Sequence, residues 1–312
     1  MPAAPVLSVV LCAHNPRADF LTRTLGALRG QNFPAGLWEL VVVDNASTPS
    51  LGGRTDLAGF TAARIVDEPC LGLTPARLRG IAASRGSAVV LVDDDNALSP
   101  DYLTQAAALL SRDSRVGVAG GRVRASLEQP APPWTREFLG NLAIADHGPV
   151  PLLAEPWEGP TRVYPSFAPV GAGLIARRAV LETYAASVTT DPSRQALDRR
   201  GRALASGGDN DIVMTALAAG WHAAYEPRLQ LAHLIPPSRL TRRYLARLNY
   251  AISRSWIAVL RRHGACPWPA VPAWSVPLRQ ARAFLRHQAW RSPAHHVRWR
   301  AACGHFAGLA DP

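Results

Sequence analysis

Short apolar runs alternate with segments of helical periodicity along the first third of the chain. Residues 6–12, 37–43 and 88–92 are apolar runs that stop at polar residues, as strands buried on both faces do. Between the first two runs, apolar side chains recur at helical spacing, at Phe20, Leu21, Leu25 and Leu28. The alternation predicts an α/β fold, with a mostly parallel sheet and helices on both of its faces.

Two further helices have start signals of their own. Thr74 as the cap and Pro75 at the first position predict one helix start. The segment Ser99-Pro100-Asp101 predicts the cap of another helix, which runs to about Ser111.

The alternation of strand and helix patterns stops in the middle of the chain and then resumes. From about residue 126 to 169 the sequence is rich in Pro, contains Trp and has no clear periodicity, so we expect a long functional loop. The elements expected after it are helices near 178–186 and 210–219 and strands at 222–225 and 229–234.

Positive charge is concentrated near the C-terminal end. The chain has 312 residues, 48% of them hydrophobic and 18% charged, which is typical of a globular protein. All 34 basic residues are Arg, and the net charge is +11. Fourteen of these arginines lie between Pro227 and Ala310, where there is no Asp or Glu. We therefore divide the chain into a main domain, 1–238, and a basic, Trp-rich helical extension, 239–312.

The extension contains two amphipathic segments. In Arg239–His263, one stripe is apolar, at Leu240, Tyr244, Leu248, Ile252 and Val259, and another is basic, at Arg243, Arg247, Arg254 and Arg261. Leu278–Arg291 is also basic, and five of the nine Trp lie between residues 256 and 299. Trp and Arg together favour the interface of an anionic membrane, whereas packing of the apolar stripe against the main domain is the alternative.

Cysteine usage and hydropathy indicate a cytoplasmic protein. The four cysteines form no CxxC pair, which argues against a disulfide-built or zinc-ribbon protein. No basic residue precedes the apolar start at 2–13, so we interpret it as a strand rather than a signal peptide. No apolar run approaches the ~20 residues that a membrane-spanning helix requires, which leaves peripheral contact at the inner face of a membrane.

Polar side chains follow three of the predicted strands, at His14-Asn15, at Asp44 and at Asp93-Asp94-Asp95. Ligands of parallel sheets bind beyond these carboxyl ends. Adjacent carboxylates raise one another's pKa unless a cation compensates, and carboxylate oxygens suit Mg²⁺ or Mn²⁺. If the strand stays extended, Asp93 and Asp95 lie on one side and Asp94 on the other. A solvated acidic turn is the alternative.

Six segments resemble the family 2 glycosyltransferases of GT-A fold, which move a sugar from a nucleotide-diphosphate donor. They are VVLCAHNP at 9–16, ELVVVDNAS at 39–47, LGLTPARLRGIAAS at 71–84, VVLVDDDNALSPDYL at 89–103, GAGLIARRAVLE at 171–182 and SGGDNDIVMTALAAGWHAAYEPRLQLAH at 206–233. Each is short, but six in the family's order are a strong signal. The resemblance, over about residues 5–245, implies a Rossmann-like GT-A sheet, inverting transfer and a role in cell-surface polysaccharide or glycan biosynthesis.

The resemblance also implies roles for particular residues. Asp209 would be the catalytic base, and Asp95 and His233 would bind Mg²⁺ or Mn²⁺. The residues expected to bind the nucleotide sugar are Asn15, Asp44, Arg77, Asp93 and Asp94. The implied partners are a nucleotide-diphosphate sugar and a glycan or lipid-linked acceptor. These roles fit together, since a metal stabilises the departing diphosphate and a base on the opposite face of the sugar activates the acceptor.

Each of these residues has a structural alternative. Asp209 and Asp211 lie where acidic residues stabilise a helix start, and His233 is also consistent with a core histidine. Asp44 is also consistent with an Asx turn, and Arg77 with a solvated helix face.

The sequence departs from the family pattern before Asp209. Gly208 stands where the family reads Glu, which leaves open whether Asp211 shares the role of base. The Gln-x-x-Arg-Trp signature of processive synthases is missing, which favours a single addition. Two other functions stay open, a sugar-phosphate nucleotidyltransferase and a basic nucleic-acid-binding protein. The Gly-free loop CAHNPRADF argues against the first, and the separation of the acidic triplet from the arginines argues against the second.

Overall fold

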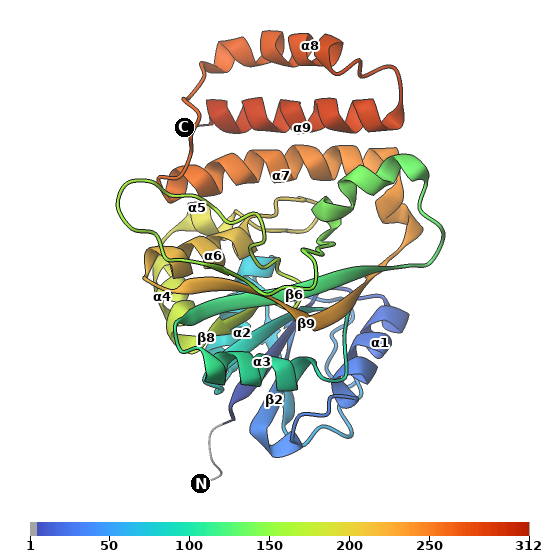
Figure 1. Ribbon diagram of the computed structural model, residues 1–312. Coiled ribbons are helices and arrows are strands. Elements are labelled where there is room, and N and C mark those ends of the chain that lie inside the picture. The colour runs from blue at the N-terminus through green and yellow to red at the C-terminus, as the bar shows by residue number, and fades with distance from the viewer. Residues whose placement is uncertain (1–4, 312) are drawn as a thin grey trace.

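The computed structural model describes residues 5–311, and a nine-stranded sheet runs through the middle of it (Figure 1). The strand order is β3-β2-β1-β4-β8-β6-β9-β5, and β7 pairs with β9 outside this path. The strands are β1 (Leu7–Ala13), β2 (Trp38–Asn45), β3 (Ala63–Glu68), β4 (Ala88–Asp93), β5 (Asn96–Leu98), β6 (Val116–Leu127), β7 (Leu152–Ala154), β8 (Ile175–Arg177) and β9 (His222–Ile235). Strands β3, β2, β1 and β4 are mutually parallel, and antiparallel β8 joins them to β6.

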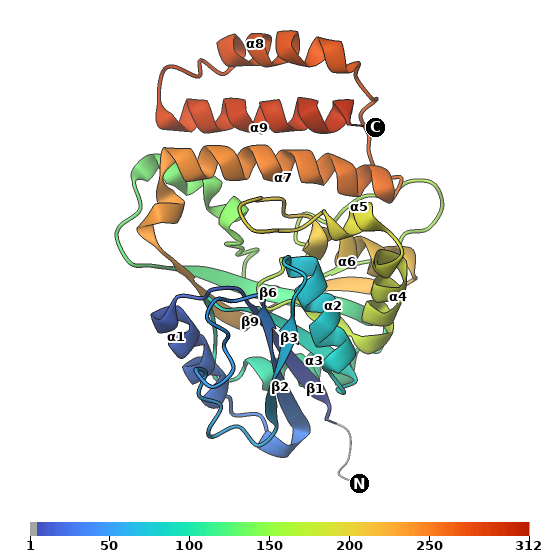
Figure 2. The same ribbon diagram turned by 180° about the vertical axis from the view of Figure 1, so that it is seen from behind.

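Helices cover both faces of the sheet, as predicted (Figure 2). The helices of the main domain are α1 (Ala18–Arg29), α2 (Leu73–Ala83), α3 (Tyr102–Arg112), α4 (Arg178–Thr189), α5 (Pro192–Gln195) and α6 (Gly208–Ala218). The short 3-10 helices are η1 (Ala35–Leu37), η2 (Pro133–Leu142), η3 (Pro237–Leu240) and η4 (Ala273–Ser275). Apolar residues of α1 and α3 pack with one face of the sheet, and those of α2, α4 and α6 pack with the other.

The continuous apolar runs arise because the first strands are buried on both faces. In β1, Leu7, Val9 and Leu11 contribute to the core beneath α1 and α3, whereas Val10 and Cys12 contribute to the core beneath α2, α4 and α6. Alternate residues of a strand point to opposite faces, so a strand with a core on each side has no polar alternation. The α/β prediction and the mostly parallel sheet are confirmed.

Several boundaries predicted from the sequence are wrong. The region 126–169 is not a structureless loop, because it includes the end of β6, the helix η2 and the strand β7. The strands predicted at 222–225 and 229–234 are one strand, β9, whose pairing with β6 shifts register between Tyr225 and Gln230. Helix α2 begins before Thr74, and Gly72, at φ 146°, takes the cap position.

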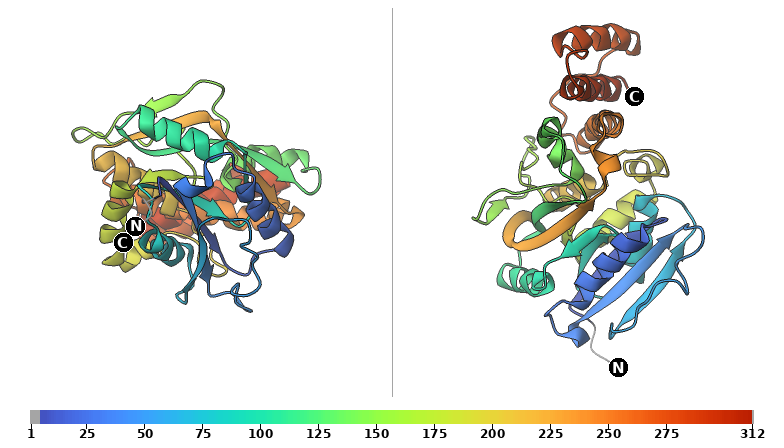
Figure 3. Two further views of the ribbon diagram at one scale, coloured as in Figure 1. Left: turned by 90° about the horizontal axis from the view of Figure 1, so that it is seen from below. Right: turned by 90° about the vertical axis from the view of Figure 1, so that its right-hand side faces the viewer.

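The helices of the extension stack above the sheet in the order α7, α9, α8, with α8 outermost (Figures 1 and 3). Its helices are α7 (Arg242–Arg262), α8 (Val276–Arg286) and α9 (Pro293–Ala310). The apolar stripe of α7 packs inward, since Leu245, Leu248 and Val259 are buried. Residues of η2, β9, α7 and α9 share one hydrophobic cluster, so the two segments divided at residue 238 are joined through a common core.

Helix α9 lies close against the backbone of α7. A Cβ atom added to Gly304 would lie 2.0 Å from the carbonyl oxygen of Tyr250. A Cβ atom added to Gly308 would lie 2.9 Å from the carbonyl oxygen of Arg254 and from Cβ of Ile257. The two helices therefore approach so closely that only residues without a side chain fit at these two positions.

Candidate active site

A cavity of about 480 Å³ lies at the carboxyl ends of β1, β2 and β4, where parallel sheets bind ligands. Its volume is within the ~300–1,000 Å³ of small-molecule sites. Six of the eight residues predicted for the site line it: Arg77, Asp93, Asp94, Asp95, Asp209 and His233. Loop and helix residues far apart in the sequence complete the wall, among them Asn141, Arg199, Arg239 and Ile252.

The acidic triplet forms a turn rather than an extension of the strand. Strand β4 ends at Asp93, Asp94 and Asp95 turn, and β5 begins at Asn96. The expected alternation of the three carboxylates is therefore wrong. Asn96 holds the turn, since its Nδ2 donates to Oδ1 of Asp95 at 3.0 Å and its Oδ1 accepts the Asp93 amide at 3.2 Å.

The turn brings Asp95 and His233 together. Antiparallel pairing of β5 with β9 sets Asn96 opposite His233, and Oδ2 of Asp95 lies 3.3 Å from Nε2 of His233. Nδ1 of His233 donates to the carbonyl oxygen of Leu142 at 2.8 Å, which leaves Nε2 as the ring nitrogen directed at Asp95. Nη1 of Arg239 lies 3.0 Å from Oδ2 of Asp95 and 3.1 Å from Nε2 of His233.

The carboxylates of the triplet differ in charge. Burial opposes ionisation of Asp95, but His233 and Arg239 outweigh it and hold the pKa of Asp95 at about 2. Burial and then the neighbouring carboxylates Asp95 and Asp93 raise the pKa of Asp94 to about 8. Burial also raises the pKa of Asp93, although Arg77 opposes this. The carboxylates of the turn therefore repel one another, and an additional cation would stabilise their charged forms.

Asp209 lies in the first turn of α6 with its carboxylate directed at the cavity wall. Its Oδ2 accepts the backbone amide of Gly171 at 2.8 Å, and its Oδ1 accepts the amide of Asn210 at 2.9 Å. Gly207 takes the cap position, so Asp209 is not the cap, but Asp209 and Asp211 both lie in the first turn, where acidic residues stabilise a helix start. Two backbone donors thus fix the orientation of this carboxylate beside the cavity.

Arg77 is buried rather than solvated, which contradicts the alternative of an exposed helix face. Its Nη1 donates to Oδ2 of Asp198 at 2.7 Å, and both side chains are at most 5% exposed. Burial alone would lower the pKa of Arg77, but Asp198, Asp93 and Asp209 raise it above its ordinary value. Arg77 therefore places a permanent positive charge in the cavity wall between the triplet and Asp209.

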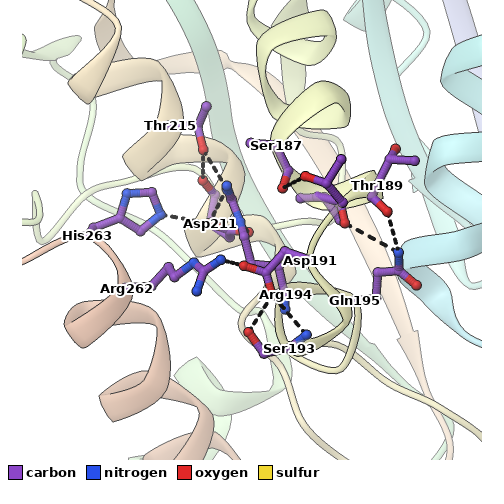
Figure 4. A network of polar contacts seen from close by, with 12 residues as sticks. Ser187, Thr189, Asp191, Ser193, Arg194, Gln195, Asp211, Thr215, Arg262 and His263 are labelled. Carbon is purple, nitrogen blue, oxygen red and sulfur yellow. Dashed lines mark hydrogen bonds and ion pairs between the residues drawn. The ribbon is translucent and has the colours of Figure 1, made fainter.

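Asp211 lies away from the cavity, in a buried polar network (Figure 4). Nη2 and Nε of Arg194 donate to its two oxygens at 2.7 and 2.8 Å. Nε2 of His263 lies 2.6 Å from Oδ1 of Asp211, and Arg262 pairs with Asp191. The network ties the end of α7 to α5 and α6, so Asp211 has a structural role and does not face a substrate.

Asn15 and Asp44 do not line the cavity but hold the loop beside it. Oδ2 of Asp44 accepts the amide of Leu51 at 2.7 Å and the hydroxyl of Ser50 at 2.8 Å, and Oδ1 accepts the amide of Ser47 at 3.1 Å. Burial opposes ionisation of Asp44, but these hydrogen bonds outweigh it and lower its pKa. Asn15, at φ 46°, accepts the amide of Thr48 on the same loop. A direct contact of either residue with a nucleotide stays a prediction.

Two cavity residues were missed from the sequence. Asp198 lies in an aperiodic polar stretch, and only the fold brings it to Arg77. Arg239 follows His233 by six residues and was counted with the extension, although it reaches back to Asp95. A search for basic residues just after the last strand of the sheet would have found Arg239 but not Asp198.

Comparison with solved structures identifies the class of fold. A mannosyltransferase, PcManGT from Pyrobaculum calidifontis, solved in complex with GDP-Man and Mn²⁺, is 20% identical with a TM-score of 0.55, covering 95% of this chain and 74% of that one. S. aureus TarS residues 1–349, solved in complex with UDP, is 15% identical with a TM-score of 0.52, covering 97% and 90%. The protein has the GT-A glycosyltransferase fold.

Comparison of sequences identifies the family. The model of the family described as "Glycosyl transferase family 2" matches residues 8–181, more than half of the chain, so this chain belongs to that family. An N-acetylglucosaminyltransferase from Mesorhizobium japonicum is 25% identical over 248 residues. The match covers 75% of this chain and 52% of that protein, so the chain spans about half the length of the curated relative it matches.

Proposed function

We propose that the chain transfers a sugar from a nucleotide-diphosphate donor to an acceptor hydroxyl with inversion at the anomeric carbon. The observation that carries this proposal is the joint presence of Asp95, His233 and Asp209 in one cavity at the carboxyl edge of the sheet. A single carboxylate positioned as a base serves a single displacement, which inverts the configuration. The proposed acceptor is a glycan or a lipid-linked acceptor, in cell-surface polysaccharide or glycan biosynthesis.

Asp209 has the properties that the base requires. Its two oxygens accept the amides of Gly171 and Asn210, which fixes its direction and leaves lone pairs for an acceptor proton. Arg77 lies against Gly171, since a Cβ atom there would be 2.7 Å from its Nη2. A buried positive charge at this position would attract the diphosphate, in addition to pairing with Asp198.

Asp95 and His233 fit a divalent cation of the hard type. A hydrogen bond such as that of His233 Nδ1 to Leu142 orients a metal-binding histidine, and Nε2 of His233 faces Oδ2 of Asp95 with Nη1 of Arg239 beside both. Mg²⁺ is usually held by one or two protein groups together with substrate phosphates, and residues 5–311 supply no cluster of three or more protein ligands. When bound, Mg²⁺ or Mn²⁺ would neutralise the departing diphosphate.

The nucleotide-binding part of the proposal uses the rest of the same edge. Asp93 and Asp94 would contact the ribose or the cation, while Asn15 and Asp44 would hold the loop 47–51 that closes the nucleobase side. His14 also lines the cavity, and its ring contacts the Asn45 carbonyl oxygen at 2.7 Å.

The experiment is a transfer assay with nucleotide sugars and Mn²⁺. We expect release of nucleoside diphosphate, loss of transfer in excess chelator, and loss of most activity per folded molecule in Asp95→Asn, which also loses the ion pair with Arg239. Release of pyrophosphate from a nucleoside triphosphate would instead show a nucleotidyltransferase. NMR of the product should show an inverted anomeric centre, and a retained configuration contradicts the single displacement.

We further propose that the outward face of α8 contacts an anionic membrane, with the enzyme at the inner face. Within residues 5–311 no helix has the length and hydropathy to span a bilayer. Four apolar side chains on or beside α8 are each more than 60% exposed: Leu278 and Leu285 on the helix, Trp274 before it and Trp290 after it. Arg282 and Arg286 are exposed among them, and no carboxylate lies on α8. Apolar residues ringed by uncompensated arginines complement anionic lipid.

Point substitutions test this membrane contact better than truncation after Arg262, which would uncover the face of α7 that packs on α9. Leu285→Glu should reduce sedimentation with phosphatidylglycerol vesicles, and binding should fall with salt and be absent with phosphatidylcholine alone. Val163→Glu is the matched control, because Val163 is 69% exposed outside the extension. Equal vesicle binding by wild type and Leu285→Glu contradicts the proposal. It is also contradicted if wild type does not bind vesicles but self-associates, and Leu285→Glu abolishes the self-association.

A further inference from the structure

The contact between Asp95 and His233 brings a buried carboxylate against an imidazole ring. Oδ2 of Asp95 and Nε2 of His233 are 3.3 Å apart, and Nδ1 of His233 donates to the carbonyl oxygen of Leu142. Both groups are at most 8% exposed, so water does not screen the charge of Asp95 well. A carboxylate buried in this way needs a cation beside it.

Arg239 supplies that cation within the chain. Its Nη1 lies 3.0 Å from Oδ2 of Asp95 and donates to Nε2 of His233 at 3.1 Å. One nitrogen of Arg239 thus contacts both of the proposed metal ligands. Asp95 and His233 are the only side-chain partners that Arg239 has among residues 5–311.

We propose that Arg239 is a built-in counter-cation that competes with the divalent metal for Asp95 and His233 and yields its place when the donor diphosphate enters. This inference rests on the proposed function, because it presupposes that these two residues are the metal ligands. Its consequence is that the metal alone binds weakly to the nucleotide-free enzyme. Metal and nucleotide diphosphate then bind together, since the phosphates give the guanidinium a new anionic partner.

The position of Arg239 in the fold allows this exchange. It lies on η3, a helix of four residues directly after β9, and its side chain is 26% exposed. It lines the same cavity as Asp95, Asp209 and Arg77, so a diphosphate bound there is within reach of a side-chain rotation. A guanidinium pairs well with phosphate oxygens, so leaving Asp95 need not leave Arg239 without a partner.

The test measures Mn²⁺ binding to the nucleotide-free protein, by electron paramagnetic resonance of the free ion. Arg239→Gln removes the competing charge and should bind Mn²⁺ about tenfold more tightly than wild type, a factor that corresponds to ~1.4 kcal/mol. Arg239→Lys keeps the charge and should stay close to wild type. Arg239→Met is a second neutral variant, expected to behave as Arg239→Gln and available if that variant does not fold.

Arg199→Gln is the matched control, because Arg199 lines the same cavity without hydrogen-bonding to Asp95 or His233. It separates the loss of this one contact from a general loss of positive charge. As a second readout, Arg239→Gln should melt at a lower temperature than wild type without metal and recover part of the difference when Mn²⁺ is added.

The results separate this inference from the proposed function. If folded Arg239→Gln binds Mn²⁺ no more tightly than wild type, or tightens no more than Arg199→Gln, the competition by Arg239 is wrong. Undiminished sugar transfer by wild type in excess chelator overturns the metal assignment itself, whatever the binding data show.

Discussion

Asp209 and Asp211 lie two residues apart on α6 but have opposite surroundings. Asp209 faces the cavity and is held by two backbone amides, whereas Asp211 is fully buried between Arg194 and His263 (Figure 4). One carboxylate keeps unused hydrogen-bonding capacity beside a cavity, and the other has its charge compensated by the protein. The same residue type within one helix turn is thus either available to a ligand or used up in the fold, according to its partners.

The largest expected effect is on the chemistry of the cavity. Asp209→Asn removes the base but keeps a side chain of the same shape, so turnover should fall by ~10²–10⁴-fold while the melting temperature stays unchanged. Titration with nucleoside diphosphate and Mn²⁺ should give the affinity of wild type. A loss below tenfold would mean that another group takes the proton.

The matched variant Asp211→Asn should reverse this outcome. It leaves Arg194 buried beside a neutral amide, and breaking a buried pair in this way costs ~3 kcal/mol of unfolding free energy. Denaturant unfolding should show the loss, while turnover per folded molecule stays within a few-fold of wild type. A large loss of turnover without loss of stability would assign Asp211 to the reaction after all.

A smaller effect should follow from disturbing the orientation of Asp209. In Gly171→Ala the new Cβ would lie 2.7 Å from Nη2 of Arg77, which must shift, and would come into contact with Oδ2 of Asp209 at 3.4 Å. Misplacement of a catalytic group by about 1 Å costs up to ~10²-fold, and we expect ~10-fold in kcat. Unchanged kcat, measured at saturating donor, would show that Asp209 does not depend on the Gly171 amide.

The smallest effect concerns Asp44, which resembles Asp211 in having its oxygens occupied by the protein. Because its pKa is lowered in the folded state, its contribution to stability is present above the unfolded pKa of ~3.9 and is lost as the pH falls through the lower folded value. Asp44→Asn should therefore be ~1 kcal/mol less stable at pH 7, with the difference shrinking in acid. Urea unfolding across pH 2–7 measures this.

The sequence predicted strands well where a strand is buried on both faces of the sheet. The runs that became β1, β2 and β4 are apolar because each has a core on both faces, and this signal needs no knowledge of tertiary partners. The strands β3, β5, β6, β7 and β8 were not predicted. In β3 the side chains are mostly half-buried and mixed in polarity, so no period stands out.

The sequence predicted which residues line the cavity where those residues stand at the end of a strand. Asp95 and His233 meet because β5 pairs with β9, and their motifs alone placed them at the same sheet edge. The role of Asp211 depended on Arg194 and His263, which are 17 and 52 residues away in the chain. No local pattern encodes such pairing, since it is set by the docking of α7 on α6.

The close approach of α9 to α7 has a consequence for how this part of the protein tolerates change. Gly304 and Gly308 sit against backbone atoms of α7, so even Ala at either position would force the two helices apart. A saturation library should therefore show these two positions among the least permissive of α9, while the exposed positions of α8 accept most polar residues. For stability, the exposed surface of α8 thus tolerates substitution, whereas the contact between α9 and α7 does not.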